Sequence, residues 1–365
     1  MSDAKRLRYW LGGTLVAGLL VYLLRGALLP FVAGMAVAYF LDPLVDRFET
    51  WKLSRSWATS LVTALFFALL VVVIVLLAPV VQGQVVGFAE RLPDYLGQAR
   101  ELLLPLLEKG LGRLDLEGPE GVSGKVAGFA FEAADIVAAV LGKLWSGGLA
   151  ILNILSLIFI TPVVAFYLLR DWDHIVDRVD SWLPRHQAPV IRELVTEIDR
   201  VLSGFVRGTG TVCLILGAFY ALALTLVGLD FGLVIGLGAG LISFVPFVGA
   251  LAGLVIAGGL ALMQFWPDYL HIGLVIAVFA VGQVVEGNFL TPKLVGGRIG
   301  LHPVWVIFAL LAGATLFGFV GVLLAVPLAA AIGVLVRFGV GRYLTSALYR
   351  GPGGEPPAPG PDPER

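Results

Sequence analysis

Two long stretches without any charged side chain constrain what this chain can fold into. Phe231–Pro267 and Pro303–Val336 contain no Asp, Glu, Lys or Arg. As straight helices they would reach roughly 50 Å, beyond a hydrocarbon core of about 30 Å, yet each is too short for two full crossings and a turn. Both runs contain Gly and Pro near the middle, namely Pro246 and Gly249 in the first and Gly318, Gly321 and Pro327 in the second. Paired apolar segments broken in this way are typical of transport sites in membrane proteins.

The composition indicates the fold class. The chain is 58% hydrophobic and only 14% charged, whereas soluble domains carry about 25% charged residues. We therefore expect an all-α polytopic integral membrane protein with about eight transmembrane helices, some of them broken or re-entrant at Gly and Pro. The net charge of −1 gives no support for nucleic-acid binding. Cys213 is the only cysteine, which excludes an intramolecular disulfide, and the histidines lack metal-ligand spacing, so we expect no metal and no cofactor.

The distribution of charge divides the chain into regions. Residues 90–143 mix charges with leucines at helical spacing, which favours an extracytoplasmic amphipathic helical region, although an ordinary packed extramembrane domain stays open. The other predicted regions are 1–89 (N-terminal membrane helices), 144–170 (a transmembrane helix), 171–206 (a cytoplasmic amphipathic helical region), 207–340 (the C-terminal transport core) and 341–365 (a disordered tail rich in Gly, Pro and Glu).

The N-terminal region begins like a signal peptide but continues past a plausible cleavage point. Arg25 splits the first apolar block into Tyr9–Leu24 and Gly26–Leu41. We interpret these halves as two tilted helices or an embedded hairpin, retained as an anchor. Basic residues flank the first and last helices at Lys5, Arg6, Arg8, Arg337, Arg342 and Arg350. The positive-inside rule therefore predicts two cytoplasmic termini and an even number of crossings.

Glycines recur at four-residue spacing in the first charge-free run. Gly232, Gly236 and Gly240 form one series, and Gly249 and Gly253 another. Small residues at this spacing let helix backbones approach closely. The alternative is that the glycines and Pro246 free backbone groups to line a cavity, since irregular backbone at membrane depth needs protein or water to satisfy it.

Glu286 is the acidic residue that most invites a functional interpretation. It follows an uncharged run from Leu270 to Val285, with Gln283 and Asn288 beside it. A carboxylate at the end of a membrane helix is costly to bury unless it is paired or protonated, and Lys293 and Arg298 are candidate partners. Glu286 is then either an interfacial charge in water or a group that binds substrate, a cation or a proton.

Motifs of energy-consuming or hydrolytic enzymes are missing from the sequence. Gly118–Lys125 only faintly resembles a phosphate loop, because Pro119 and Val126 stand where such a loop needs Gly and Ser or Thr. There is no G-x-S-x-G elbow and no H-E-x-x-H helix. We therefore expect neither an ATP-driven pump nor an enzyme.

Several motifs in the C-terminal half resemble those of the AI-2E family of bacterial membrane proteins, the autoinducer-2 exporter-like permeases. They are S-F-V-P-F-V-G at 243–249, V-E-G-N-F-L-T-P-K-L-V-G at 285–296, L-H-P at 301–303, F-G-F-V-G at 317–321 leading to Pro327, and F-Y-L-L-R-D at 166–171. The family often has R-G-Q where this chain has Arg207-Gly208-Thr209. The resemblance is strong over about 160–338 and elsewhere rests on hydropathy alone.

The resemblance implies a permease of about eight helices in the bacterial inner membrane, with both termini cytoplasmic on the charge argument above. Some relatives are associated with export of autoinducer-2 and others with sodium/proton antiport. We therefore expect a secondary transporter that moves a small solute, with an autoinducer-2-like signal as one candidate. A Na⁺/H⁺ antiporter and a non-transport membrane scaffold are the alternatives.

The expected site lies between the Pro246 break, the connector from Glu286 to Lys293, and the break at Gly318–Gly321. Its candidate residues are Glu286, Asn288, Lys293, Pro246, Gly249, Gln283, Pro292 and Gly318. The expected partners are a small-molecule or ion substrate and membrane lipid, with no nucleic acid. We also expect a homo-oligomer, with a pentamer as the suggested form.

Overall fold

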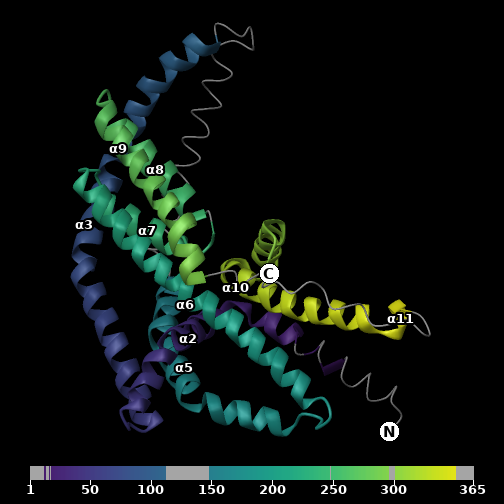
Figure 1. Ribbon diagram of the computed structural model, residues 1–365. Coiled ribbons are helices and arrows are strands. Elements are labelled where there is room, and N and C mark those ends of the chain that lie inside the picture. The colour runs from purple at the N-terminus through teal and green to yellow at the C-terminus, as the bar shows by residue number, and fades with distance from the viewer. Residues whose placement is uncertain are drawn as a thin grey trace. The chain divides into compact units, whose positions relative to one another are not determined.

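The computed structural model describes residues 12–111 except 14, 15 and 17, and then residues 148–246, 248–295 and 301–350 (Figure 1). Every regular element within these ranges is helical, so the all-α prediction is confirmed. The helices are η1 Arg25–Ala27, α2 Leu28–Thr50, α3 Arg55–Leu111, α5 Gly148–Ser181, α6 Ala188–Leu226, α7 Gly232–Ile242, α8 Val248–Phe265, α9 Tyr269–Val285, the π-helix η2 Glu286–Val295, α10 Pro303–Thr345 and α11 Ala347–Arg350. Most of the predicted region 90–143, from residue 112, and the tail from residue 351 lie outside the described residues.

The chain divides into two compact units. The first unit combines the described residues of Met1–Gly26, Asp173–Arg207 and Val295–Arg365. The second unit combines those of Ala27–Trp172 and Gly208–Leu294. The transport core predicted at 207–340 thus contributes to both units, and α6 has its N-terminal half in the first and its C-terminal half in the second.

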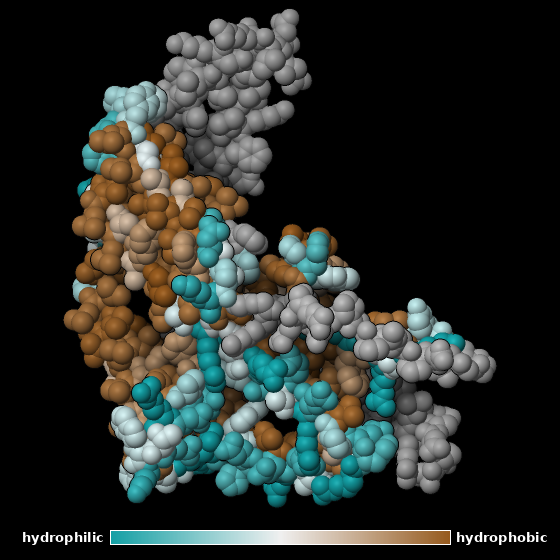
Figure 2. Space-filling model, viewed as in Figure 1, coloured by the Kyte–Doolittle hydropathy of each residue, from teal (hydrophilic) through white to brown (hydrophobic). Residues whose placement is uncertain are grey.

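Membrane-spanning length and apolar surface characterise the helices. Among the described residues, seven helices are long and apolar enough to cross a bilayer, and α7 is a shorter apolar helix. In the second unit, Figure 2 shows apolar side chains (brown) over α3 and α7–α9. A soluble monomer rarely exposes apolar patches larger than a few hundred Å², so lipid is the environment that these surfaces fit. The fold is that of a polytopic membrane protein.

In the second unit, α2, α3 and α5 pack around Leu41, Val45 and Leu169. The apolar run ends at Leu41, but α2 continues through Pro43 to Thr50, farther than the sequence predicts. Arg55 explains this continuation. Its guanidinium donates to the Leu169 carbonyl at 3.0 Å and lies 3.8 Å from Asp42 and 3.5 Å from Glu49, so the acidic residues of the α2 extension have a cation partner.

Helix α3 is also longer than expected. It runs without interruption from Arg55 to Leu111, through Pro79 and across the region boundary predicted between residues 89 and 90. The charged residues that return from Glu90 onward therefore do not mark the end of this helix. One of them, Arg91, forms an ion pair with Asp230, which precedes α7.

In the first unit, α10 contains the break that the sequence predicts. Gly318 has φ 60° and ψ −135°, a conformation that is essentially restricted to glycine. Gly313 and Gly321 then lie so close that a Cβ on either would collide with the backbone of the other. Beyond the break, Ala330 and Val334 pack against Val201 of α6. The predicted break at Gly318 is therefore confirmed, while Pro327 lies inside the helix.

Candidate functional site

Backbone contact between α6 and α7 forms the base of the candidate site in the second unit. A Cβ at Gly232 would lie 2.9 Å from the Leu224 carbonyl carbon, one at Gly236 would collide with Ala221, and one at Gly240 would collide with Gly217. These are the glycines whose four-residue spacing predicts close packing, and that interpretation is confirmed. Because neither backbone has room for even one methyl group, α6 and α7 are fixed against each other along three turns.

The chain between α7 and α8 breaks where the sequence predicts. Helix α7 ends at Ile242, Pro246 lies half-buried in the break, and α8 begins at Val248. Gly249 is buried, and a Cβ there would collide with Ser243, whose hydroxyl donates to the Ala239 carbonyl at 2.9 Å. One turn later, a Cβ at Gly253 would lie 2.6 Å from the Phe279 ring of α9. The glycines of α8 thus bring α9 against the α7–α8 turn.

The segment predicted as a polar connector from Glu286 is helical up to Val295, which corrects that expectation. Helix α9 passes directly into the π-helix η2 at Glu286. Pro292 has no N–H to donate and disturbs the usual i→i+4 hydrogen bonding of the preceding turn, and η2 is wound with the wider i→i+5 spacing. Isolated π-helical turns are rare and are frequent at functional sites.

Tyr220 on α6 is the buried polar group that sequence analysis did not identify. Its side chain is fully buried and stacks on Phe279 of α9, with ring centroids 4.8 Å apart. Its hydroxyl has no hydrogen-bond partner among the residues that the structure describes. A Cβ at Gly282 would collide with the phenol ring, so this glycine makes room for it. Leaving such a hydroxyl unsatisfied costs about 1–3 kcal/mol.

Glu286 lies four residues beyond Gly282, at the start of η2, and is half-buried. Its carboxylate interacts electrostatically with the Tyr220 hydroxyl and with the Cys213 thiol, both from α6. No ion pair to Lys293 forms, and Arg298, the other candidate partner, lies outside the described residues. The structure therefore groups Glu286 with Tyr220 and Cys213, and we call these three residues the Glu286 site.

The other predicted site residues differ in burial and in the unit to which they belong. Gln283 is half-buried on α9, whereas Asn288, Pro292 and Lys293 are exposed on η2. Gly318 belongs to the first unit and is exposed at the α10 break. The one signal in the sequence that points to Tyr220 is a single tyrosine within the uncharged span that follows Arg207.

Comparison with known proteins places the chain among membrane transport proteins. The family model described as AI-2E family transporter matches residues 11–341. "Putative transport protein YrrI" of Bacillus subtilis is 28% identical over 84% of this chain and 85% of its own length. "Putative permease PerM" of Escherichia coli is 25% identical over 88% of this chain and 90% of its own. "AI-2 transport protein TqsA" of Escherichia coli is 25% identical, with 92% and 94% covered.

Proposed function

Because the chain belongs to the AI-2E transporter family, we propose that it is a secondary transporter that moves a small hydroxyl-bearing solute across the bacterial plasma membrane. Membership of the family makes it a membrane transport protein. The secondary mode of transport is supported by the lack of a nucleotide-binding motif in the sequence. The candidate cargo is a molecule like autoinducer-2, the compound in the name of the relative TqsA.

The observation that carries this proposal is the unpartnered, buried Tyr220 hydroxyl, which interacts electrostatically with the Glu286 carboxylate. A carboxylate accepts hydrogen bonds and a phenol can donate one. A solute with several hydroxyl groups can therefore donate to Glu286 and accept from Tyr220. Such a solute gains more binding free energy from the phenol than a purely apolar solute does, because it removes the cost of leaving the Tyr220 hydroxyl without a partner.

The broken helices supply the motion that transport needs. Discontinuous membrane helices in transporters typically flank the binding site and move during alternating access. The break around Pro246 adjoins α8 and α9 in the second unit, while the break at Gly318 divides α10 in the first. We assign both breaks as hinges, and we retain the predicted homo-oligomer as part of the proposal.

One further candidate follows from the same residues. Glu286 is the carboxylate of the Glu286 site, and the exchange of Na⁺ for H⁺ would require a carboxylate. An antiporter would show flux that depends steeply on pH and on Na⁺, whereas a permease for a neutral solute need show neither. The two candidates can therefore be separated in a single preparation.

Purified chain in ATP-free liposomes tests the proposal. We expect uptake of a furanone or polyol probe, driven by an imposed gradient. Glu286→Gln and Tyr220→Phe should each reduce the rate about tenfold or more, the value of one charge-assisted or buried hydrogen bond. The matched controls Glu90→Gln and Tyr269→Phe change exposed groups and should transport like the wild type.

Each alternative outcome has a defined meaning. Flux of Na⁺ and H⁺ without flux of any solute would replace the permease with the antiporter. Solute flux that needs ATP with this chain alone would refute the secondary mode. Normal solute flux in both site variants would remove the Glu286 site from the mechanism while leaving the transporter.

A further inference from the structure

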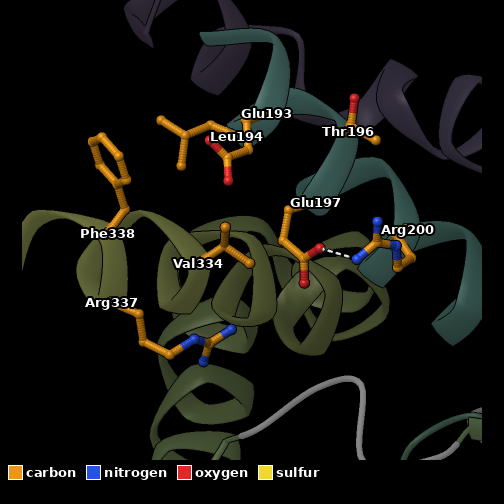
Figure 3. A pocket seen from close by; sticks show the side chains of 8 residues that line it. All are labelled: Glu193, Leu194, Thr196, Glu197, Arg200, Val334, Arg337 and Phe338. Carbon is orange, nitrogen blue, oxygen red and sulfur yellow. Dashed lines mark hydrogen bonds and ion pairs between the residues drawn. The ribbon is translucent and has the colours of Figure 1, made fainter. Parts of the chain in front are cut away.

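A pocket in the first unit lies between the N-terminal half of α6 and the C-terminal part of α10 (Figure 3). Its volume is about 430 Å³, within the range of roughly 300–1,000 Å³ that is usual for small-molecule sites. The lining residues are Glu193, Leu194, Thr196, Glu197 and Arg200 from α6, and Val334, Arg337 and Phe338 from α10. The pocket shares no residue with the Glu286 site.

Two of the charged residues that line this pocket pair with each other, and two do not. Glu197 and Arg200 neutralise each other through an ion pair of 2.5 Å. Glu193 on one helix and Arg337 on the other remain, and neither makes an ion pair or a side-chain hydrogen bond within the described part of the chain. Figure 3 shows the Glu193 carboxylate directed from α6 towards the pocket, with the Arg337 side chain running along α10. One anion on α6 and one cation on α10, each without an ion-pair partner in the described part of the chain, therefore line the same space, which is large enough for a ligand.

The sequence puts the α10 wall of the pocket at the level of lipid headgroups. Arg337 is the first charge after the uncharged run Pro303–Val336, and in α6 the charged residues up to Arg207 precede an uncharged span. The first charges at the end of a membrane helix usually lie at the membrane–water interface. Large apolar side chains next to the pocket are exposed on both helices, namely Val195, Ile332, Leu335 and Val336.

We propose that this pocket binds the phosphoethanolamine headgroup of a membrane lipid. The phosphate is held by Arg337, and the primary ammonium is held by Glu193. Val334 and Phe338 line the apolar side, and the acyl chains follow the exposed apolar residues of α10. A guanidinium suits a phosphate because it offers a fork of donors, and a primary ammonium can donate hydrogen bonds to a carboxylate.

This assignment predicts a ranking of lipids. The quaternary ammonium of phosphatidylcholine has no N–H to donate to Glu193, so this lipid loses one charge-assisted hydrogen bond. Phosphatidylglycerol has no cation for Glu193 at all. We therefore expect phosphatidylethanolamine to bind about tenfold more tightly than either, because one such bond corresponds to about a factor of ten or more.

The test uses the full chain in detergent and the dioctanoyl forms of the three lipids, with bound lipid counted by native mass spectrometry. Glu193→Gln should bring phosphatidylethanolamine down to the affinity of phosphatidylcholine and leave phosphatidylcholine unchanged. Arg337→Gln should weaken both about tenfold. The matched controls Asp177→Asn and Arg178→Gln alter exposed charges of the same unit that do not line the pocket, and they should bind as the wild type does.

Two results would overturn the proposal. Equal affinity for the three lipids would show that the ammonium is not recognised, and an unchanged ranking in both Gln variants would place lipid binding elsewhere. Free phosphoethanolamine serves as a competitor that separates the two sources of this headgroup. Weak competition supports the lipid, whereas competition as strong as that of the dioctanoyl lipid would make the soluble zwitterion the occupant. Thermal unfolding that matches the wild type shows that the exposed Gln substitutions leave the fold intact.

Discussion

Replacing Tyr220 with Phe should make the protein more stable and less active. The hydroxyl is fully buried and has no partner in the described structure, so it adds a desolvation cost of about 1–3 kcal/mol without a compensating bond. Phe keeps the ring that stacks on Phe279 and the fit against Gly282. We therefore expect the free energy of unfolding to rise by about 1–3 kcal/mol, which is about 5- to 150-fold in the unfolding equilibrium.

Cys213 provides the assay for this prediction. It is the only cysteine of the chain, and it is partly buried on α6, so a thiol-reactive fluorophore reports when the helix becomes accessible on heating. The melting temperature of Tyr220→Phe should rise by up to about 2–4 °C per kcal/mol. Tyr167→Phe is the control, because this tyrosine is exposed on α5, so its replacement removes no buried hydroxyl.

The sign of the change in melting temperature decides whether this reasoning holds. A lower melting temperature for Tyr220→Phe would mean that the hydroxyl is hydrogen-bonded in the resting protein, by water or by Glu286, and the reasoning would fail. A higher melting temperature with lost solute flux would show a group retained at the expense of stability because transport uses it.

Three further predictions follow from other parts of the chain. Gly240→Ala should destabilise the protein by about 1–3 kcal/mol, because the new Cβ collides with Gly217. Gly238→Ala should be neutral or stabilising, because a Cβ there has nothing within 4 Å, and thermal unfolding compares the two variants. The hydrogen bond from His271 lowers the pKa of the Asp268 carboxyl. Asp268 should therefore contribute stability at a pH above the ordinary carboxyl pKa of about 4 and lose it as the pH falls through the lowered pKa. The difference in melting temperature between wild type and Asp268→Asn should then vanish in acid, and a constant difference from neutral to acid pH would contradict this. Single cysteines at Gly97 and Ser181 in a Cys213→Ala background should be labelled from opposite sides of the membrane, and labelling from one side would refute the topology predicted from the basic residues.

The helix breaks were predictable because they depend on local chemistry. The uncharged runs required membrane helices, and their Gly and Pro residues marked where those helices stop. Gly318 shows this most clearly, since its φ of 60° is one that residues with a Cβ rarely adopt. The helix ends were less predictable: α2 passes Asp42 because Arg55, from the next helix, supplies a cation, and no local pattern contains that partner.

The candidate site was predicted only in part, for a related reason. Glu286 stood out as a carboxylate at the end of an uncharged run, but Lys293 was a candidate partner only through its closeness in sequence. The groups with which Glu286 interacts electrostatically, Tyr220 and Cys213, lie far back on α6. Tyr220 fits between the helices because Gly282 leaves space for the phenol ring, and the need for that glycine becomes visible only when α6 and α9 are packed together.

From the packing we expect α9, rather than α7, to move during transport. Helices α6 and α7 touch through backbone atoms at three successive turns, so sliding one past the other would require the whole interface to separate. Contacts of α9 with this pair run instead through the side chains of Tyr220 and Phe279, which can change rotamer, and α9 passes into a π-helical segment with few buried residues. A solute that bridges Tyr220 and Glu286 would hold α9 against α6, and its release would free α9 and η2. We therefore expect cross-links between α6 and α7 to be tolerated during transport, and cross-links between α6 and α9 to stop it.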